Sequence, residues 1–154
     1  MKINIKDEAL TTFNEILNIE SEPICSNHVD ISSSESIFDS FKKRLIIRKL
    51  LKKPCIKTTI NIGYGLSQSQ IKYIVKEYIR EIRWNDLQYA GFIQEQNHDN
   101  TTINIYFSRI TFDKHKVIDL KFLNQNWQET EIIQKALIQA KLLTVQNAKS
   151  TITR

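Results

Sequence analysis

The chain has 154 residues, of which 41% are apolar and 25% are charged, and its 22 Lys and Arg against 17 Asp and Glu give a formal net charge of +5. A chain of this length buries roughly two-thirds of the surface that its unfolded form exposes, so a hydrophobic core needs neither disulfides nor a metal. The composition excludes collagen, coiled coils and disordered chains. No apolar run reaches the roughly 18 residues of a membrane span and no signal-peptide core opens the chain, so we expect a cytoplasmic protein without a membrane partner.

The charge is divided unevenly along the chain. Residues 1–40 hold two basic and eight acidic side chains, a net charge of −6, which leaves 20 basic and nine acidic side chains, a net charge of +11, for residues 41–154. A strongly basic body attracts polyanions, and nucleic acid is the first candidate partner.

The first 36 residues are expected to form an acidic helical leader followed by a polar linker. Residues 6–19 place apolar side chains at helical spacing, which predicts a short amphipathic helix. Residues 20–36 hold Pro23 and a run of serines, which is typical of a linker or surface loop. We expect a single α+β domain over residues 37–154.

A basic helix is predicted to open this domain. Ser34, Glu35 and Ser36 offer capping chemistry for a helix that runs to about Leu51 and ends before Pro54. Its apolar stripe is Ile37, Phe38, Phe41, Leu45, Ile46 and Leu50, and its other face is Lys42, Lys43, Arg44, Arg48, Lys49, Lys52 and Lys53.

Strand and helix signals alternate through the rest of the chain. Period-2 alternation predicts a strand at 56–62, and further strands are expected at 89–93, 102–111 and 117–122, with a basic hairpin tip at 113–116. A Ser-x-x-Gln capping box at Ser67 and Gln70 precedes a strongly periodic helix over 71–82, and a last helix is expected at 129–143. The order α-α-β-α-β-β-β-α predicts an α+β fold with a mainly antiparallel sheet flanked by helices.

Common catalytic signatures are missing from the sequence. It has no Gly-rich phosphate loop, no GxSxG and no HExxH motif. The histidines fall in three separate polar segments and favour solvated loops over a metal cluster. No neighbouring group in the sequence would lower the pKa of the Cys55 thiol, so we expect an inert buried thiol.

The stretch from Leu66 to Leu120 resembles the core of the MobA/MobL-type relaxases, which are HUH single-strand endonucleases of mobile elements. The resemblance is carried by a capped helix, the strand LQYAGFIQEQ, a short polar hairpin, the strand TINIYFSRI, a basic turn and KVIDL. It implies a relaxase-like sheet on which three histidines of two neighbouring strands hold a divalent metal, while a tyrosine near the N-terminus attacks the scissile phosphate.

The residues that would carry this chemistry are replaced. The first His corresponds to Gln94 or Glu95, and the His-x-His pair corresponds to Thr102 and Asn104. This former metal site favours no bound metal, or at best a loosely held Mg²⁺ or Mn²⁺ if Glu95 points inward. The N-terminal tyrosine is also absent, which leaves Tyr64 and Tyr106 as the remaining nucleophile candidates.

The sequence therefore favours a catalytically degenerate relaxase-like protein that binds single-stranded or hairpin DNA in conjugative transfer or replication, together with relaxosome or replication proteins. The expected DNA-binding cations are Lys42, Lys43, Arg44, Arg48, Lys49, Lys52, Lys53, Lys57, Arg80, Arg83, Arg109, Lys114 and Lys116. Two alternatives stay open: a protein-interaction adaptor that kept the fold without DNA, and an atypical active relaxase with an altered metal site.

Overall fold

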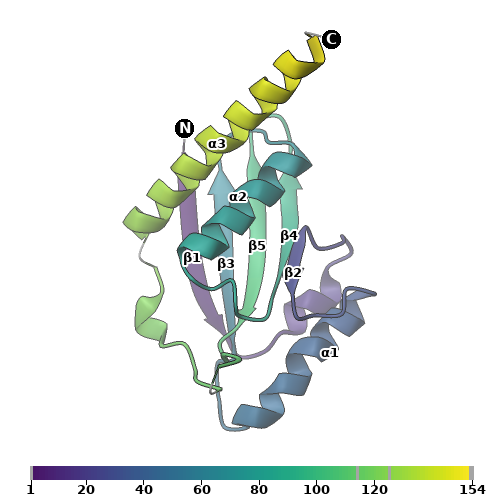
Figure 1. Cartoon of the computed structure of the whole chain (residues 1–154). Coiled ribbons are helices and arrows are strands. Elements are labelled where there is room, and N and C mark those ends of the chain that lie inside the picture. The colour runs from purple at the N-terminus through teal and green to yellow at the C-terminus, as the bar shows by residue number, and fades with distance from the viewer. Residues whose placement is uncertain (1, 114, 125, 153–154) are drawn as a thin grey trace.

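A five-stranded antiparallel sheet organises the protein in a computed structural model, which describes the backbone of residues 2–113, 115–124 and 126–152 and the side chains of 2–113, 115–124 and 128–141 (Figure 1). The strand order across the sheet is β1-β3-β5-β4-β2. The elements are β1 (Ile3–Leu10), 3-10 helix η1 (Asn14–Asn18), β2 (Cys25–Asn27), α1 (Ser34–Arg44), 3-10 helix η2 (Leu45–Arg48), β3 (Cys55–Ile62), α2 (Gln68–Glu81), β4 (Tyr89–Gln96), β5 (Thr101–Ser108), 3-10 helix η3 (Leu120–Phe122) and α3 (Asn126–Ile152).

Helices α2 and α3 cover one face of the sheet, here called the helical face (Figure 1). The capping box of α2 forms as predicted, with the Ser67 hydroxyl accepting from the Gln70 backbone N–H and the Gln70 side chain accepting from the Ser67 backbone N–H. The main core lies between these helices and the sheet and includes Ile56, Ile60, Ile62, Ile71, Ile74, Val75, Tyr78, Ile79, Ile103, Ile105, Phe107, Ile133 and Leu137. Burial of these side chains drives the sheet and the two helices together.

One polar side chain on the helical face ties β1 to the segment before α3. Asp7 is only 5% exposed, and its Oδ1 accepts a 2.6 Å hydrogen bond from the Thr58 hydroxyl. Its Oδ2 accepts a 2.9 Å bond from the backbone N–H of Asn124, whose Oδ1 accepts from the Asp7 backbone N–H. A buried carboxylate needs such donors, and here they fix the chain in front of α3.

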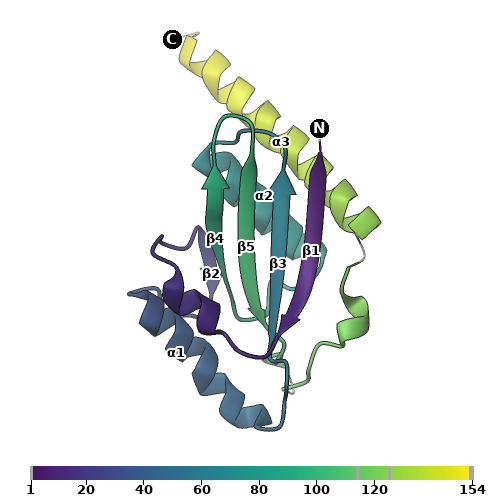
Figure 2. The same ribbon diagram turned by 180° about the vertical axis from the view of Figure 1, so that it is seen from behind.

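The opposite face of the sheet is covered over only one of its ends, where η1 and α1 pack on it (Figure 2). A second core forms there from Phe13, Ile16, Ile37, Phe41, Cys55, Ala90, Phe92 and Tyr106. The rest of this face is not covered by any helix among the described residues, and we call it the open face.

The predicted helix over residues 6–19 is wrong. Residues Ile3–Leu10 form β1, which pairs with β3 along its whole length, and only Asn14–Asn18 are helical, as a single 3-10 turn. Ile3 and Ile5 alternate with polar neighbours, so their side chains point toward the core with period 2. The pairing of this strand with β3 outweighs the helical spacing of the apolar residues that follow. The predicted helix and the predicted linker therefore each supply one edge strand of the sheet, β1 and β2 respectively.

Two other predicted elements also differ. The basic helix ends at Arg44 and continues only as η2, because the chain has to turn into β3 at Cys55. Ile46 and Leu50, expected in its buried stripe, are 68% and 94% exposed. The predicted strand 117–122 is also wrong: it keeps one isolated bridge between Ile110 and Val117, and its end forms η3.

The α+β class and the antiparallel sheet are confirmed. The strand predicted at 56–62 is β3, whose residues alternate between the two faces as expected. The strand predicted at 89–93 continues to Gln96 through a register shift between Ile93 and Glu95. Gly91 allows β2 to approach this strand, because a Cβ there would lie 2.7 Å from the Cys25 Sγ.

Candidate functional site

The open face is lined by amide and hydroxyl side chains from three adjacent strands. The Thr59 hydroxyl donates to Asn104 Oδ1 at 3.0 Å, and Asn104 Nδ2 donates to Gln94 Oε1 at 2.8 Å. Asn61 Nδ2 donates to the Thr102 hydroxyl at 2.8 Å. These bonds run across β3, β5 and β4, so the open face presents a polar network in place of an apolar one.

Three of the four residues expected at the former metal site lie on the open face, where Gln94 and Asn104 belong to one hydrogen-bonded group and Thr102 belongs to another with Asn61. Gln94 and Asn104 are directly hydrogen-bonded. Thr102 precedes Asn104 by two residues and lies on the same side of β5. Glu95 lies opposite Thr102 in the register, but its Oε1 accepts a 2.7 Å bond from Asn97 Nδ2 in the hairpin turn. The chain thus places Gln94, Thr102 and Asn104 on the open face and leaves the Glu95 carboxylate engaged with the turn.

These residues do not fit a tightly held divalent metal. Asn104 Oδ1 and Gln94 Oε1 already accept hydrogen bonds, and the site supplies neutral oxygens where Mg²⁺ or Mn²⁺ prefers carboxylates. Across the described residues, no three His, Cys, Asp or Glu side chains lie so that they could hold a metal ion.

A shallow hollow of about 320 Å³ lies where η1 meets the open face. Lys57 Nζ forms a 2.6 Å ion pair with Glu15 Oε1, and the Tyr106 hydroxyl donates to the same oxygen at 3.2 Å. The hollow is lined by Glu15, Asn18, Ile19, Lys57, Gln94, Asn104 and Tyr106. The polar network and the ion pair therefore border one continuous surface.

Neither tyrosine candidate has the surroundings of a nucleophile. Tyr106 is 2% exposed, and burial, then the charge of Glu15, raises the pKa of its phenol. Tyr64 is exposed in the turn after β3, where its ring lies 4.0 Å from Lys141 Nζ of α3. It does not line the hollow that contains Tyr106.

The strongest cluster of free positive charge is the basic segment, defined as residues 42–53. Lys43, Lys49, Lys52 and Lys53 are exposed, and none of them forms an ion pair with another residue that the structure describes. Lys42 lies 5.2 Å from the Phe38 ring centroid. The segment contains no acidic residue, so its field is not compensated locally.

Three of the predicted DNA-binding arginines make hydrogen bonds to backbone carbonyls of other segments. Arg44 donates to the Thr111 carbonyl and stacks 3.8 Å over the Phe112 ring, and Arg48 donates twice to the His115 carbonyl. Arg109 is 8% exposed and donates to the carbonyls of Lys53 and Ile118. They tie the loop before η3 to the basic segment.

The remaining predicted cations are scattered. Lys57 is paired with Glu15 on the open face, whereas Arg80 pairs with Glu77 and Glu81 on α2, which packs on the helical face. Arg83 follows the same helix and is exposed, Lys116 is exposed in the loop beside the basic segment, and Lys114 lies outside the described residues. The predicted cations therefore do not form one surface.

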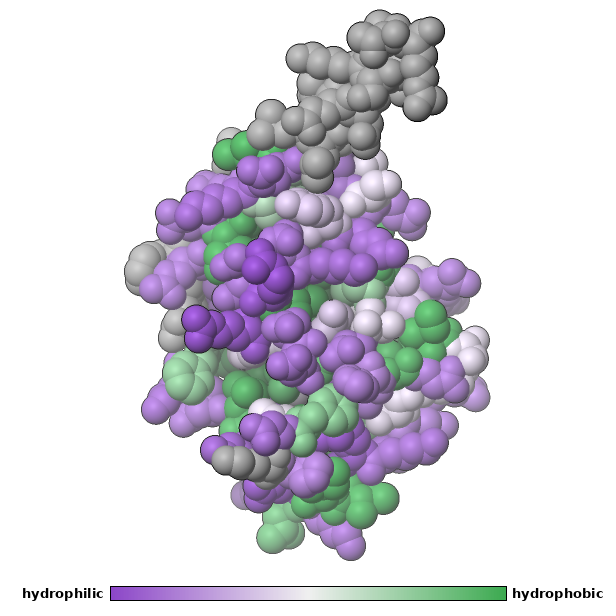
Figure 3. Space-filling model, in the orientation of Figure 1, coloured by the Kyte–Doolittle hydropathy of each residue, from purple (hydrophilic) through white to green (hydrophobic). Residues whose placement is uncertain are grey.

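Apolar side chains also gather at the basic segment. Leu50 and Ile46 are strongly exposed and Ile47 is 42% exposed, and apolar surface is visible at the end of the molecule where α1 ends (Figure 3). Ile47, Leu50 and Leu51 line a hollow with Arg48, Lys49 and Val117. The segment is thus both basic and apolar.

Sequence reasoning missed Glu15, Thr59 and Asn61 as members of the open face. The alternation of residues 56–62 already places Thr59 and Asn61 on the side opposite the isoleucines, so this signal was available. Glu15 lacked any signal, because its position depends on the turn that η1 makes across the sheet.

Comparison with known proteins gives no relative for the chain: no family model, no curated protein and no solved structure matches it. Within the described ranges, a helix with the length and apolar character needed to cross a membrane is not found. The arrangement of the residues is therefore the basis on which a function can be inferred.

Proposed function

We propose that the chain is a DNA-binding protein with a relaxase-like sheet that has lost its catalytic groups, and that it binds single-stranded or hairpin DNA in the conjugative transfer or replication of a plasmid or other mobile element. The observation that carries the proposal is the convergence of Gln94, Thr102 and Asn104 on the open face. These positions correspond to the metal-binding histidines of the relaxases that the sequence resembles.

The chemistry of the open face suits a polynucleotide better than a metal. Asn and Gln side chains carry both donors and acceptors, which match the edges of unpaired bases. The face also has few uncompensated charges, since Lys57 is paired with Glu15 and Lys6 with Glu8. We infer that it contacts bases and that phosphate contacts come from elsewhere.

The basic segment is the source that we assign to those phosphate contacts. Lys53 precedes β3 by two residues and Thr59 lies four residues into the strand. At about 3.3 Å per residue these positions are roughly 20 Å apart, a distance that about six phosphates span at the spacing of one duplex strand. One short single strand can therefore reach both surfaces.

The test is binding of a fluorescent single-stranded oligonucleotide at low salt, measured by anisotropy. We expect measurable affinity for the wild type, and a loss of about tenfold or more in a Lys49→Glu, Lys52→Glu and Lys53→Glu variant. Each single-strand phosphate contact contributes about −0.7 to the slope of log affinity against log salt, so the slope should become shallower by about 2.

The matched control changes the same charge on the helical face, with Lys72→Glu, Lys76→Glu and Lys135→Glu on exposed positions of α2 and α3. We expect this control to weaken binding much less than the variant in the basic segment. Absence of DNA affinity in the wild type, or equal losses in the two variants, would refute the proposed interface.

A second candidate function is a protein-interaction adaptor, which the exposed Ile46 and Leu50 favour. Under this alternative, the double variant Ile46→Ser and Leu50→Ser loses activity in the cell. The variant with Lys49→Glu, Lys52→Glu and Lys53→Glu keeps that activity. The atypical relaxase is less well supported because the Tyr106 hydroxyl is buried and bound to Glu15. Detection of a covalent 5′ adduct in a nicking assay with Mg²⁺ or Mn²⁺ would support the relaxase alternative.

A further inference from the structure

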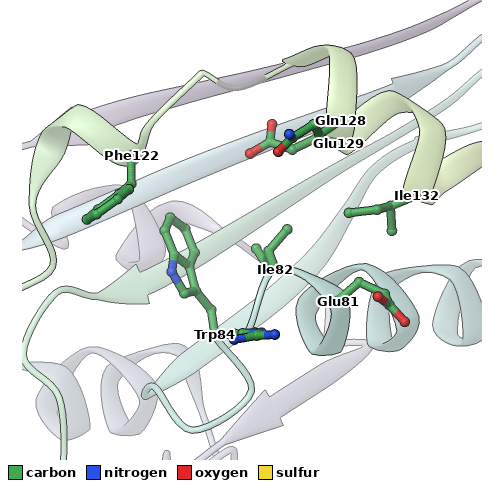
Figure 4. A pocket seen from close by; sticks show the side chains of 8 residues that line it. Glu81, Ile82, Trp84, Phe122, Gln128, Glu129 and Ile132 are labelled. Atoms are coloured by element: carbon green, nitrogen blue, oxygen red, sulfur yellow. The ribbon is translucent and has the colours of Figure 1, made fainter.

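The outer side of α1 carries charged side chains that the fold leaves without ion-pair partners. The pocket between the end of α2 and the start of α3 provides a contrast (Figure 4), because its acid Glu129 is 7% exposed and interacts with Tyr78 of α2. The charges of α1 are all exposed, and none of them forms an ion pair with another residue that the structure describes. They are Glu35, Asp39, Lys42 and Lys43.

These four side chains lie in one row along the helix. Asp39 follows Glu35 by four residues, and the two lysines follow Asp39 by three and four, which is the spacing of neighbours on one helical face. The opposite face of α1 packs against η1 and the second core (Figure 2). The row is therefore free of the rest of the fold, and it is acidic at the start of the helix and basic at its end.

Exposed aliphatic side chains accompany both ends of this row. Ile31 is 55% exposed in the loop before α1, and a 2.9 Å hydrogen bond from the Asp30 backbone N–H to Ser40 Oγ holds this loop along the helix. Ile46 and Leu50 are 68% and 94% exposed just after the basic end. Exposed apolar side chains beside unpaired charges are typical of a surface that binds another protein.

The order of the charges makes this surface complementary to itself. If a second copy lies antiparallel, the acidic start of each α1 faces the basic end of the other, and every contact occurs twice about a two-fold axis. The same arrangement brings the loop with Ile31 toward the end of the other copy that carries Ile46 and Leu50. A parallel arrangement would instead place like charges opposite each other.

We propose that α1 is the contact surface of an antiparallel homodimer, in which Glu35 and Asp39 of each copy meet Lys42 and Lys43 of the other. The 11 residues of α1 span about 16 Å, which is short for an interface of the standard size of roughly 800 Å² per partner. The dimer is therefore weak and depends on charge complementarity. The charge row includes none of the lysines that we assign to DNA, so dimerisation does not rest on the proposed function.

The experiment is sedimentation equilibrium of the full chain at about 200 μM in low salt, a concentration suited to a small interface. One variant carries Glu35→Lys and Asp39→Lys, and the other carries Lys42→Glu and Lys43→Glu. We expect the wild type to dimerise and each variant alone to associate about tenfold more weakly or less, because like charges then face each other. An equimolar mixture of the two variants should dimerise as the wild type does, since opposite charges face each other again in the mixed dimer.

The matched control is Lys72→Glu and Lys76→Glu, two exposed positions of α2, which should leave dimerisation within about twofold. Circular dichroism of each variant establishes that it is folded. A measurement on the wild type needs no variant: about 0.5 M salt should weaken the dimer by about tenfold or more, because the charges are screened.

Four results would each overturn the proposal. They are a monomeric wild type, which would leave the face to a different protein, an association that does not respond to salt, an equal loss in the α2 control, and a mixture of the folded variants that associates no better than either alone.

Discussion

The two faces of the sheet are built from the same strands but are closed in different ways. On the helical face, isoleucines of β3 and β5 pack under α2 and α3 in one large core. On the opposite face the smaller core under η1 and α1 stops partway, and Thr59, Asn61, Thr102 and Asn104 continue it as a hydrogen-bonded network. We therefore expect side chains of the helical face to contribute more to stability than side chains of the open face.

The most direct test of this comparison substitutes neighbours on β3. Ile60 is completely buried on the helical face, and Ile60→Ala should lower the free energy of unfolding by about 2–5 kcal/mol through lost contacts and a cavity. Thr59 on the open face makes one partly solvated hydrogen bond, so Thr59→Ala should cost about 1 kcal/mol or less. Urea denaturation measures both, and similar losses would contradict the comparison.

A second prediction restores three imidazoles to the open face with Gln94→His, Thr102→His and Asn104→His. If these positions converge as a relaxase-like site requires, the triple variant should bind Co²⁺ or Zn²⁺ and gain about 2.7 kcal/mol of stability at a metal concentration 100 times the dissociation constant. Thermal denaturation with and without a chelator measures this gain.

The control for the metal prediction is the single variant Asn104→His. It keeps one imidazole on the same strand and should show little stabilisation by the metal. A triple variant that responds no more than the single one would argue against the relaxase-like geometry.

A third prediction uses the buried acid of the helical face. Because the pKa of Glu129 is raised to about 7 in the folded protein, the folded state binds a proton more tightly than the unfolded state between about pH 4.5 and 7. The contribution of Glu129 to stability is therefore present below about pH 4.5 and is lost as the pH rises to about 7. Relative to the wild type, Glu129→Gln should become more stable across this range by about 1–2 kcal/mol.

Denaturation of the wild type and Glu129→Gln at matched pH values isolates this contribution, since the other titrating groups are shared. The asymmetry between the faces is sharpened if the difference grows with pH, because no buried acid lies among the described residues of the open face. A difference that is constant with pH would show that Glu129 titrates normally.

The local sequence was sufficient to predict the elements that carry strong periodicity. The alternation of residues 56–62 and the capping box at Ser67 identify β3 and α2, and both form as expected. Residues 6–19 misled because their apolar spacing fits a helix, whereas pairing of β1 with the full length of β3 decides the conformation. Long-range pairing of this kind leaves little trace in a short window.

The candidate site was predicted in part for the same reason. Gln94, Thr102 and Asn104 were identified from the resemblance to the relaxase motif, and Thr102 and Asn104 share a face because residues two apart on a strand point the same way. The role of Arg109 could not be found from its charge, because burial among the carbonyls of Lys53 and Ile118 turns a cation into a structural donor. Charge alone does not reveal which cations remain free.

The smallest effect that we predict concerns the two thiols, one in each core. Cys25 of β2 belongs to the core of the helical face, where burial raises the pKa of its thiol to about 12, and Cys55 of β3 is fully buried in the second core, where burial also raises its thiol pKa. Neither thiolate is populated near neutral pH, so alkylation in the native state should be slow for both.

Since β2 joins the sheet through only three residues, local opening should expose Cys25 at lower urea than Cys55. Pulsed alkylation followed by mass spectrometry measures each site, and coincident labelling would mean that this edge of the helical face unfolds only together with the whole sheet.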